Sequence, residues 1–240
     1  MERKIRLDEL DEGRYIKQFS DGFLFGTDAV LLADLITLPA SDCVGAEFGT
    51  GTGIVPILLA SGQPFRHITA FEIDPDYAAL AADNFETLGL SDRVSAVCAD
   101  LKDAPGYFDK KIDFVFTNPP YMKADSGHRG DDPKREAARR EIHCTVESLC
   151  ASAGEILKNG GLFFAVYRCD RLADMLGAMR SAGIEPKELT LVDTAGRGYP
   201  ELMLVRGKKR AAPGMKVRVR RLKAATTRDK FGGLYEDSDT

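Results

Sequence analysis

Residues 43–53 read CVGAEFGTGTG, in which a short apolar run is followed by three glycines at alternate positions. The run predicts a buried strand at Cys43–Phe48, and the residues that follow predict a helix at Gly53–Ser61. Glycine permits positive φ and lets the backbone approach a ligand closely, and free N–H groups at a helix start favour an anionic ligand. The spacing matches neither a phosphate loop nor a G-x-G-x-x-G dinucleotide site. The stretch therefore predicts a ligand-binding strand–loop–helix unit, with a tight turn that binds nothing as the alternative.

The alternation of short apolar runs with longer amphipathic runs continues along the chain. Further strands are predicted at His67–Glu72, Val94–Ala99, Ile112–Thr117, Leu162–Tyr167, Glu188–Asp193 and Glu201–Arg206. Further helices are predicted at Pro75–Leu88, Ile142–Lys158, closed by Asn159-Gly160-Gly161, and Asp170–Ala182. Strands that alternate with helices form a mainly parallel sheet covered on both faces. The sequence thus predicts a doubly wound α/β fold with a seven-stranded sheet.

Segments of different character flank this domain, which spans residues 43–206. Residues 1–42 are predicted to be an N-terminal extension that packs on the core, with an apolar helix at Asp28–Ile36 capped by Thr27. Residues 207–240 are predicted to be a basic C-terminal tail that follows a turn at residues 211–214. Within this tail, Lys216–Arg220 alternates basic and β-branched residues, which is the pattern of an exposed strand.

Charge is distributed unevenly along the chain. The net charge is −4, but residues 206–230 hold 11 Lys and Arg against one acidic residue, whereas residues 1–205 hold 22 against 33. A basic block of this density can bind nucleic acid, or it can be a solvated tail without a partner. Composition alone does not separate these two readings.

Other compositional features exclude several classes of protein. The five cysteines are never spaced as C-x-x-C, so neither a zinc site nor a disulfide framework is indicated. The chain has no run of apolar residues long enough to cross a membrane. Its first residues are charged and carry no apolar signal segment. We therefore expect a cytoplasmic protein without a metal or a membrane partner.

Acidic residues end the second and third predicted strands. Glu72 lies about twenty residues after the glycines, where an acid can bond both hydroxyls of a ribose. Asp100 follows the third strand, where its carboxylate or a neighbouring amide can meet an adenine edge. Either acid alone could simply cap the end of its strand. Together with the glycine loop, they lie on the rim where doubly wound folds bind ligands.

The fourth predicted strand is followed by Asn118-Pro119-Pro120-Tyr121. With the glycine loop and the two acids, this tetrapeptide resembles the class I S-adenosylmethionine methyltransferases, over residues 43–206. In the N-P-P-Y group of that class, the substrate is an exocyclic amine of a base or a glutamine amide. Its nitrogen is a weak nucleophile, because its lone pair is delocalised. The Asn118 side-chain oxygen and the Pro119 carbonyl can accept its two hydrogens, in bonds that strengthen as positive charge develops.

The two remaining residues of the tetrapeptide have supporting roles in this reading. Adjacent prolines hold the Pro119 carbonyl rigid, which preserves the geometry of in-line transfer. Tyr121 offers a ring face on which a planar base or amide can stack. The alternative is that Asn-Pro-Pro only ends the strand with a turn.

Three further stretches resemble the tRNA adenine-N6 methyltransferases that act next to the anticodon of valine tRNA. These are FGTDAVLL at 25–32, REAAR at 135–139 and LMLVRGKK at 202–209. The resemblance implies a tRNA substrate and S-adenosylmethionine as the cofactor. It implies cofactor contacts at Thr27, Asp28, Glu47, Phe48, Gly49, Thr50, Gly51, Gly53, Glu72, Ile73, Asp100, Leu101 and Asn118. The expected substrate contacts are Tyr121, Lys208, Lys209, Arg210, Arg218, Arg220 and Arg221.

Three alternatives to this reading stay open on the sequence. A glutamine-amide methyltransferase of translation release factors shares the tetrapeptide, but it usually carries a larger N-terminal helical domain. A guanine-N2 methyltransferase of ribosomal RNA usually has a companion domain that is not found here. A non-catalytic RNA-binding relative would have no reason to keep the glycine loop, Glu72, Asp100 and Asn118 together. The sequence indicates no oligomeric state.

Overall fold

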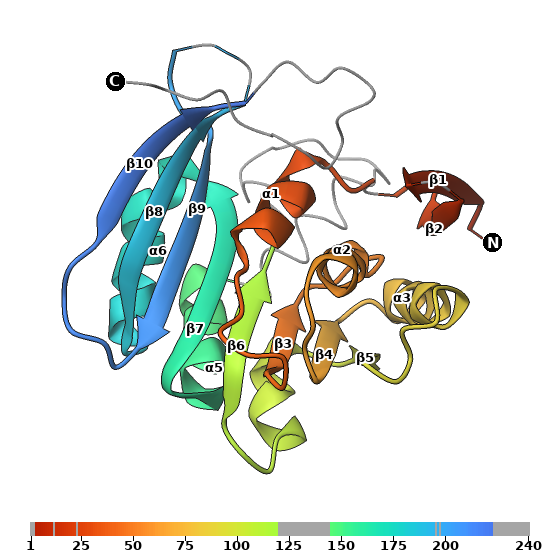
Figure 1. Ribbon diagram of the computed structural model, residues 1–240, viewed down its shortest axis with the longest axis horizontal. Coiled ribbons are helices and arrows are strands. Elements are labelled where there is room, and N and C mark those ends of the chain that lie inside the picture. Colours follow the sequence, from red (N-terminus) through yellow and green to blue (C-terminus); the bar gives the residue numbers. More distant parts are fainter. Residues whose placement is uncertain are drawn as a thin grey trace, which may run out of the picture.

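An eight-stranded sheet forms the centre of the computed structural model, which describes residues 3–11, 13–22, 24–119, 145–194, 196 and 198–222. The strands follow the order β10-β8-β9-β7-β6-β3-β4-β5 (Figure 1). Their bounds are β3 Val44–Phe48, β4 His67–Glu72, β5 Val94–Cys98, β6 Ile112–Thr117, β7 Leu157–Arg168, β8 Ile184–Asp193, β9 Leu202–Lys209 and β10 Lys216–Arg221. Only β9 runs antiparallel to its neighbours. The other seven strands therefore end at one edge, which we call the C-terminal edge of the sheet.

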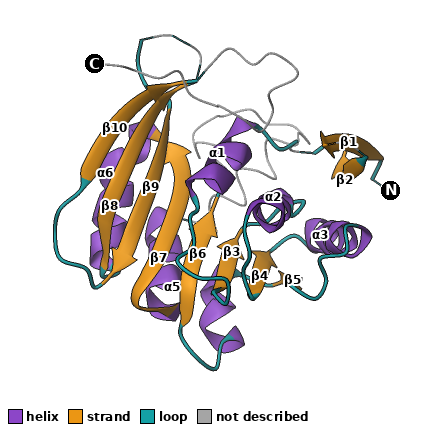
Figure 2. Cartoon of the chain, viewed as in Figure 1, coloured by secondary structure: helices purple, strands orange, loops and turns teal. Residues whose placement is uncertain are grey.

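Helices cover both faces of the sheet (Figure 2). On one face lie α1 Thr27–Leu35, α2 Ile54–Gly62 and α3 Pro75–Thr87, and on the other lie η1 Leu101–Tyr107, α5 Val146–Ile156 and α6 Leu172–Ser181. Successive residues of a strand point to opposite faces, so Phe114 and Phe116 join the core under α1 and α2, while Val115 joins the core under α5. Burial on both faces explains why the strands read as continuous apolar runs. The predicted doubly wound α/β fold is confirmed.

The start of α3 shows how local sequence fixes an element. Asp74 precedes the helix, and its carboxylate accepts hydrogen bonds from the N–H groups of Asp76 at 2.9 Å and Tyr77 at 3.3 Å. Pro75 occupies the first helical position, where its missing N–H costs nothing and its fixed φ suits the helix. The helix therefore begins directly after β4, beside the C-terminal edge.

The predicted number of strands was wrong by one. Lys216–Arg221 is an exposed strand, as predicted, but it pairs in parallel with β8 from Glu188 to Asp193 and so extends the sheet. No helix shields this edge among the described residues, and Val217 and Val219 are 54% and 60% exposed. The basic, alternating pattern indicated a strand, but it did not indicate its partner.

Two predicted boundaries near helices also need correction. The helix expected to run to Lys158 ends at Ile156, and Lys158–Gly161 belong to β7, because Leu157 already pairs with Ile112 across a register shift. The first part of that prediction, residues 142–144, lies outside the described residues. Thr27 is not the N-cap of α1. The N-cap is Gly26, which has no side chain to accept hydrogen bonds from the N–H groups at the start of the helix.

The N-terminal residues form an antiparallel hairpin that the sequence did not predict, with β1 at Ile5–Asp11 and β2 at Arg14–Phe19. The hairpin is tied to α3, because the Asn84 Oδ1 accepts a hydrogen bond from Lys17 N at 2.9 Å and the Asn84 Nδ2 donates to Lys17 O at 3.0 Å. The Arg3 guanidinium lies over the Phe19 ring, 3.9 Å from its centroid. No helix of the described residues is long and apolar enough to cross a membrane.

Candidate functional site

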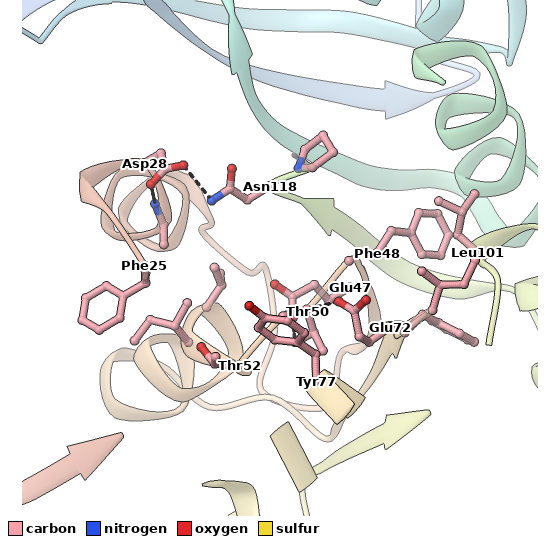
Figure 3. Close-up of a pocket in the computed structure, with 18 of the residues that line it drawn as sticks. Phe25, Asp28, Glu47, Phe48, Thr50, Thr52, Glu72, Tyr77, Leu101 and Asn118 are labelled. Atoms are coloured by element: carbon pink, nitrogen blue, oxygen red, sulfur yellow. Dashed lines mark hydrogen bonds between the residues drawn. The ribbon is translucent and has the colours of Figure 1, made fainter. Parts of the chain in front are cut away.

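A cavity of about 410 Å³ lies at the C-terminal edge, where β3, β4 and β6 end. Its walls also include residues of the N-terminal segment and of α1 (Figure 3). The cavity thus lies where doubly wound folds bind their ligands, in the crevice beyond the carboxyl ends of the strands.

The glycine loop forms the floor of this cavity. Gly49, Gly51 and Gly53 have φ of +73°, +57° and +83°, values that side chains other than glycine rarely adopt. At Gly53 a Cβ would also lie 2.5 Å from the Phe85 ring. The loop is held to β4, because the N–H groups of Gly49 and Thr50 both donate to the Phe71 carbonyl, at 2.9 and 3.0 Å. Glycine is therefore required here by backbone conformation and, at Gly53, by the close approach of α3.

Glu72 ends β4 and is almost fully buried. Its Oε2 accepts a hydrogen bond from Gly51 N at 2.9 Å, and its Oε1 accepts one from Asp74 N at 3.1 Å. The carboxylate therefore links the glycine loop to the start of α3. Asp100 lies at the end of the next strand, where its carboxylate caps η1 by accepting from Lys102 N at 2.9 Å.

Glu47 is a fully buried acid beside the glycine loop. Burial raises the pKa of its carboxyl from 4.5 to about 8, the Thr50 hydroxyl that donates to it lowers the pKa in part, and the nearby Glu72 charge raises it. The side chain is therefore protonated at neutral pH, whereas in the unfolded chain it is ionised. Burial is tolerated because the neutral form avoids the cost of a desolvated charge.

This shifted pKa predicts how stability depends on pH. Between pH 4.5 and 8 the folded protein holds one proton at Glu47 that the unfolded chain has lost. The contribution of Glu47 to stability is therefore complete below pH 4.5 and is lost as pH rises toward 8, at up to about 1.4 kcal/mol per pH unit. We expect Glu47→Gln to remove this slope, because glutamine is uncharged and still accepts from Thr50. Urea unfolding at pH 5.5 and pH 7.5 measures the difference.

An exposed acid supplies the control for this measurement. Glu86 lies on the exposed side of α3, so Glu86→Gln should change stability equally at both pH values. If the wild type and Glu47→Gln lost stability in parallel between the two pH values, the assignment of the raised pKa to Glu47 would be wrong.

Asn118 follows β6 directly and lines the cavity together with Pro119. Its Nδ2 donates a hydrogen bond to the Asp28 Oδ2 at 3.1 Å, so α1 and the end of β6 meet at this amide (Figure 3). Pro120 and Tyr121 lie outside the described residues.

Most residues predicted to contact the cofactor line this one cavity. They are Asp28, Glu47, Phe48, Gly49, Thr50, Gly51, Glu72, Ile73, Asp100, Leu101 and Asn118. Thr27 and Gly53 do not line it, although each is adjacent in the chain to a residue that does. The structure thus brings together residues that are up to 90 positions apart in the sequence.

The predicted substrate contacts fall into two groups that the structure separates. Lys208, Lys209 and Arg210 lie at the end of the antiparallel β9, hence at the edge opposite Asn118. Lys209 has a structural contact there, because its Nζ donates to the Ala182 carbonyl at the end of α6, at 2.6 Å. Arg218, Arg220 and Arg221 lie on β10, which runs toward the C-terminal edge. Tyr121 lies outside the described residues.

Several cavity residues were not predicted from the sequence, among them Leu24, Phe25, Tyr77 and Arg168. Arg168 ends β7, so its strand-end position could have indicated it. Leu24 and Phe25 carry no such signal. Phe25 is positioned by the hairpin, since its N–H donates to the Gln18 Oε1 at 2.9 Å. Among the described residues, no group of three His, Cys, Asp or Glu side chains could hold a metal ion.

Comparison with known proteins gives a consistent result. The family model described as methyltransferase small domain matches residues 19–179. The tRNA1(Val) (adenine(37)-N6)-methyltransferase of a Flavobacteriaceae bacterium is 30% identical over 190 residues, which cover 73% of this chain and 79% of that protein. The protein of the same name from Porphyromonas gingivalis is 29% identical, over 75% of this chain and 72% of that protein.

Solved structures share the fold at low sequence identity. A predicted O-methyltransferase from Agrobacterium tumefaciens superposes with a TM-score of 0.63 at 22% identity, over 80% of this chain and 85% of that one. A geranyl diphosphate C-methyltransferase from Streptomyces coelicolor, solved in complex with S-adenosyl-L-homocysteine, has a TM-score of 0.55 at 14% identity, over 75% and 74%.

Proposed function

Because the chain belongs to the methyltransferase small domain family, and within it to the tRNA1(Val) (adenine(37)-N6)-methyltransferases, we propose that it methylates N6 of an adenine in valine tRNA. The chain is an S-adenosylmethionine-dependent methyltransferase. The observation that carries the proposed target atom is Asn118, whose side-chain amide lines the cavity beside the glycine loop. We expect the enzyme to act in the cytoplasm, where its proposed tRNA substrate is found.

The cavity fits S-adenosylmethionine in its volume and in the chemistry of its walls. At about 410 Å³ it lies within the range of small-molecule sites. Glu72 would hold the ribose hydroxyls, and the apolar side chains of Ile73 and Leu101 would enclose the adenine beside Asp100. The glycine loop would hold the methionine part through its backbone. When bound, the cofactor supplies a methyl group that its sulfonium has already activated, so the protein needs no general base strong enough to ionise an amine.

The residues of this chain then have to orient and polarise the substrate amine. The Asn118 Oδ1 and the Pro119 carbonyl would accept the two amine hydrogens, which turns the nitrogen lone pair toward the methyl group. These bonds strengthen as positive charge develops on nitrogen, so they favour the transition state over the ground state. Exclusion of water by the apolar walls, which include Phe25 and Phe48, strengthens the same bonds.

Mass spectrometry of tRNA nucleosides from a deletion strain and its parent tests the proposed function. We expect N6-methyladenosine to be absent from valine tRNA of the deletion strain and restored by the wild-type gene. An unchanged tRNA profile, together with a release factor that has lost its glutamine methyl group, would instead select the amide methyltransferase. Loss of N2-methylguanosine from ribosomal RNA would select the third reading.

We also propose that the basic strand β10 holds the tRNA backbone. Arg218 lies in the middle of β10, and Arg220 and Arg221 end the strand near the C-terminal edge. Acids of β8 lie beside two of them: Glu188 is 3.4 Å from Arg218 and Asp193 is 3.6 Å from Arg221. In each pair the arginine is about half exposed, with 48% of the Arg218 side chain and 55% of the Arg221 side chain accessible, so phosphate can approach these guanidinium groups.

Replacing arginines of β10 with glutamine should therefore weaken RNA binding without altering the cofactor site. For Arg218→Gln/Arg220→Gln we expect about a tenfold loss of tRNA affinity, a shallower salt dependence and unchanged cofactor affinity. Filter binding between 50 and 200 mM salt measures both effects. Lys208→Gln/Arg210→Gln changes two of the predicted contacts at the opposite edge, and we expect a smaller loss of affinity there because these residues lie farther from Asn118. Equal losses of tRNA affinity in the two variants would show that tRNA binding does not depend on position relative to the C-terminal edge.

A further inference from the structure

The hydrogen bond between Asp28 and Asn118 bears on how the side-chain amide of Asn118 is oriented. A side-chain amide has two different ends: Oδ1 accepts hydrogen bonds, and Nδ2 donates them. The proposed mechanism needs the oxygen to face the substrate amine. If the amide turned over, Nδ2 would direct its hydrogens at the amine hydrogens, and the contact would become repulsive. Catalysis therefore requires a contact that holds the Asn118 amide in one of its two orientations, which are similar in shape.

In the structure, a residue of α1 makes such a contact. The Asp28 Oδ2 accepts a hydrogen bond from the Asn118 Nδ2 at 3.1 Å (Figure 3). An ionised carboxylate accepts hydrogen bonds and donates none, so only the nitrogen end of the amide can face it. From this geometry we propose that Asp28 is a positioning residue, which turns the Asn118 Oδ1 toward the target amine. This inference rests on the proposed function of Asn118.

The carboxylate is itself held in place. The Asp28 Oδ1 accepts a hydrogen bond from Ala29 N at 3.0 Å, in the first turn of α1, where the helix dipole favours a negative charge. Gly26 leaves room for it, since a Cβ at that position would lie 2.8 Å from the Asp28 Oδ1. Both oxygens of Asp28 are thus directed by neighbours.

The helix that carries Asp28 is fixed against the core. Its residues Ala29, Leu31 and Leu32 are buried, and α1 packs against α2, β7 and β9. Asn118 follows β6, which lies between β7 and β3 in the sheet. Asp28 and Asn118 are therefore both held by the packed core. The orientation of the Asn118 amide does not depend on the substrate being bound.

Asp28 also lines the cavity, so the competing reading is a direct contact with a cationic group of the cofactor. The two readings differ in which constant they change. A positioning role acts on kcat through Asn118 and leaves cofactor affinity nearly intact. A charge contact acts on the Kd of the cofactor and requires the carboxylate itself.

Two substitutions separate these readings. Asp28→Ala removes the acceptor, and we expect kcat for tRNA to fall about 30- to 100-fold while the cofactor Kd changes less than about threefold. Asp28→Asn keeps the shape of the side chain but can present a donor to Asn118, especially if its oxygen stays on Ala29 N, so it no longer selects one end of the Asn118 amide. We therefore expect Asp28→Asn to lower kcat by about tenfold or more, again with the cofactor Kd changed less than about threefold. Asp34→Ala, on the exposed side of the same helix, is the matched control and should leave kcat and Kd unchanged.

The decisive measurements are kcat from steady-state methyl transfer to tRNA and Kd from calorimetry with S-adenosylhomocysteine. In the Asn118→Ala background, Asp28→Ala should reduce kcat no further, because its effect passes through Asn118. A normal kcat in Asp28→Ala, or equal rises of Kd in both Asp28 variants, would overturn the inference and leave the proposed function standing. A wild-type protein that methylates no tRNA, while its cofactor binds, would overturn both.

Discussion

Asn118→Ala is expected to lower the rate of methyl transfer to tRNA about 10³-fold, the range seen when a group that stabilises developing charge is removed. The proposed role of the Asn118 Oδ1 is to accept a hydrogen from the amine, and alanine has no acceptor. The cofactor Kd should change less than about threefold, because the glycine loop, Glu72 and Asp100 are untouched. Single-turnover kinetics with valine tRNA and calorimetry with S-adenosylhomocysteine measure the two quantities separately.

The control for this experiment is another asparagine. Asn159 is exposed on β7, near the edge opposite the cavity, and Asn159→Ala should transfer methyl groups at the wild-type rate. If Asn118→Ala kept near-normal turnover, the substrate amine would have to be polarised by other groups, and the assignment of the tetrapeptide as the reaction centre would be wrong.

Glu72→Ala is the second change with a large expected effect, and it acts on the cofactor. We expect the Kd for S-adenosylmethionine to rise about 100-fold, because the variant loses the proposed ribose contact and the hydrogen bonds to Gly51 N and Asp74 N. Calorimetry with S-adenosylmethionine and its demethylated product gives the change directly.

An exposed glutamate at the far end of α3 shows whether the effect is specific. Glu86→Ala, on α3, should bind the cofactor as the wild type does. Thermal unfolding of each variant without cofactor accounts for any loosening of the glycine loop. A Glu72→Ala protein with unchanged Kd would mean that the ribose is held elsewhere.

The strands that could be predicted most directly from sequence are those that are buried on both faces of the sheet. Strands such as β3 and β6 are buried on both faces and read as continuous apolar runs. The hairpin lacks that signal, since Ile5 and Leu7 are 53% and 62% exposed and alternate with charged residues. The place of β10 beside β8 is a tertiary pairing, which a local pattern cannot specify.

The same distinction holds for the candidate site. Glu72, Asp100 and Asn118 lie at the ends of strands, and the rule that parallel strands end at one edge was enough to predict that they lie together. Phe25 is positioned at the cavity by the hairpin, through its hydrogen bond to Gln18, and Tyr77 lies there because α3 begins beside the C-terminal edge. The roles of Glu72 and Asn118 in binding and catalysis stay predictions, which Glu72→Ala and Asn118→Ala test.

The edge position of β10 has a consequence for the integrity of the protein. Without β10, residues Glu188–Asp193 of β8 would present an unpaired row of N–H and C=O groups on that side, which is a template for pairing with another chain. The charged side chains of β10, such as Lys216 and Arg218, discourage that association at the new edge. Truncation of the chain before β10 would therefore expose this row and promote self-association, so the segment that we propose for tRNA binding also limits association between copies of the enzyme.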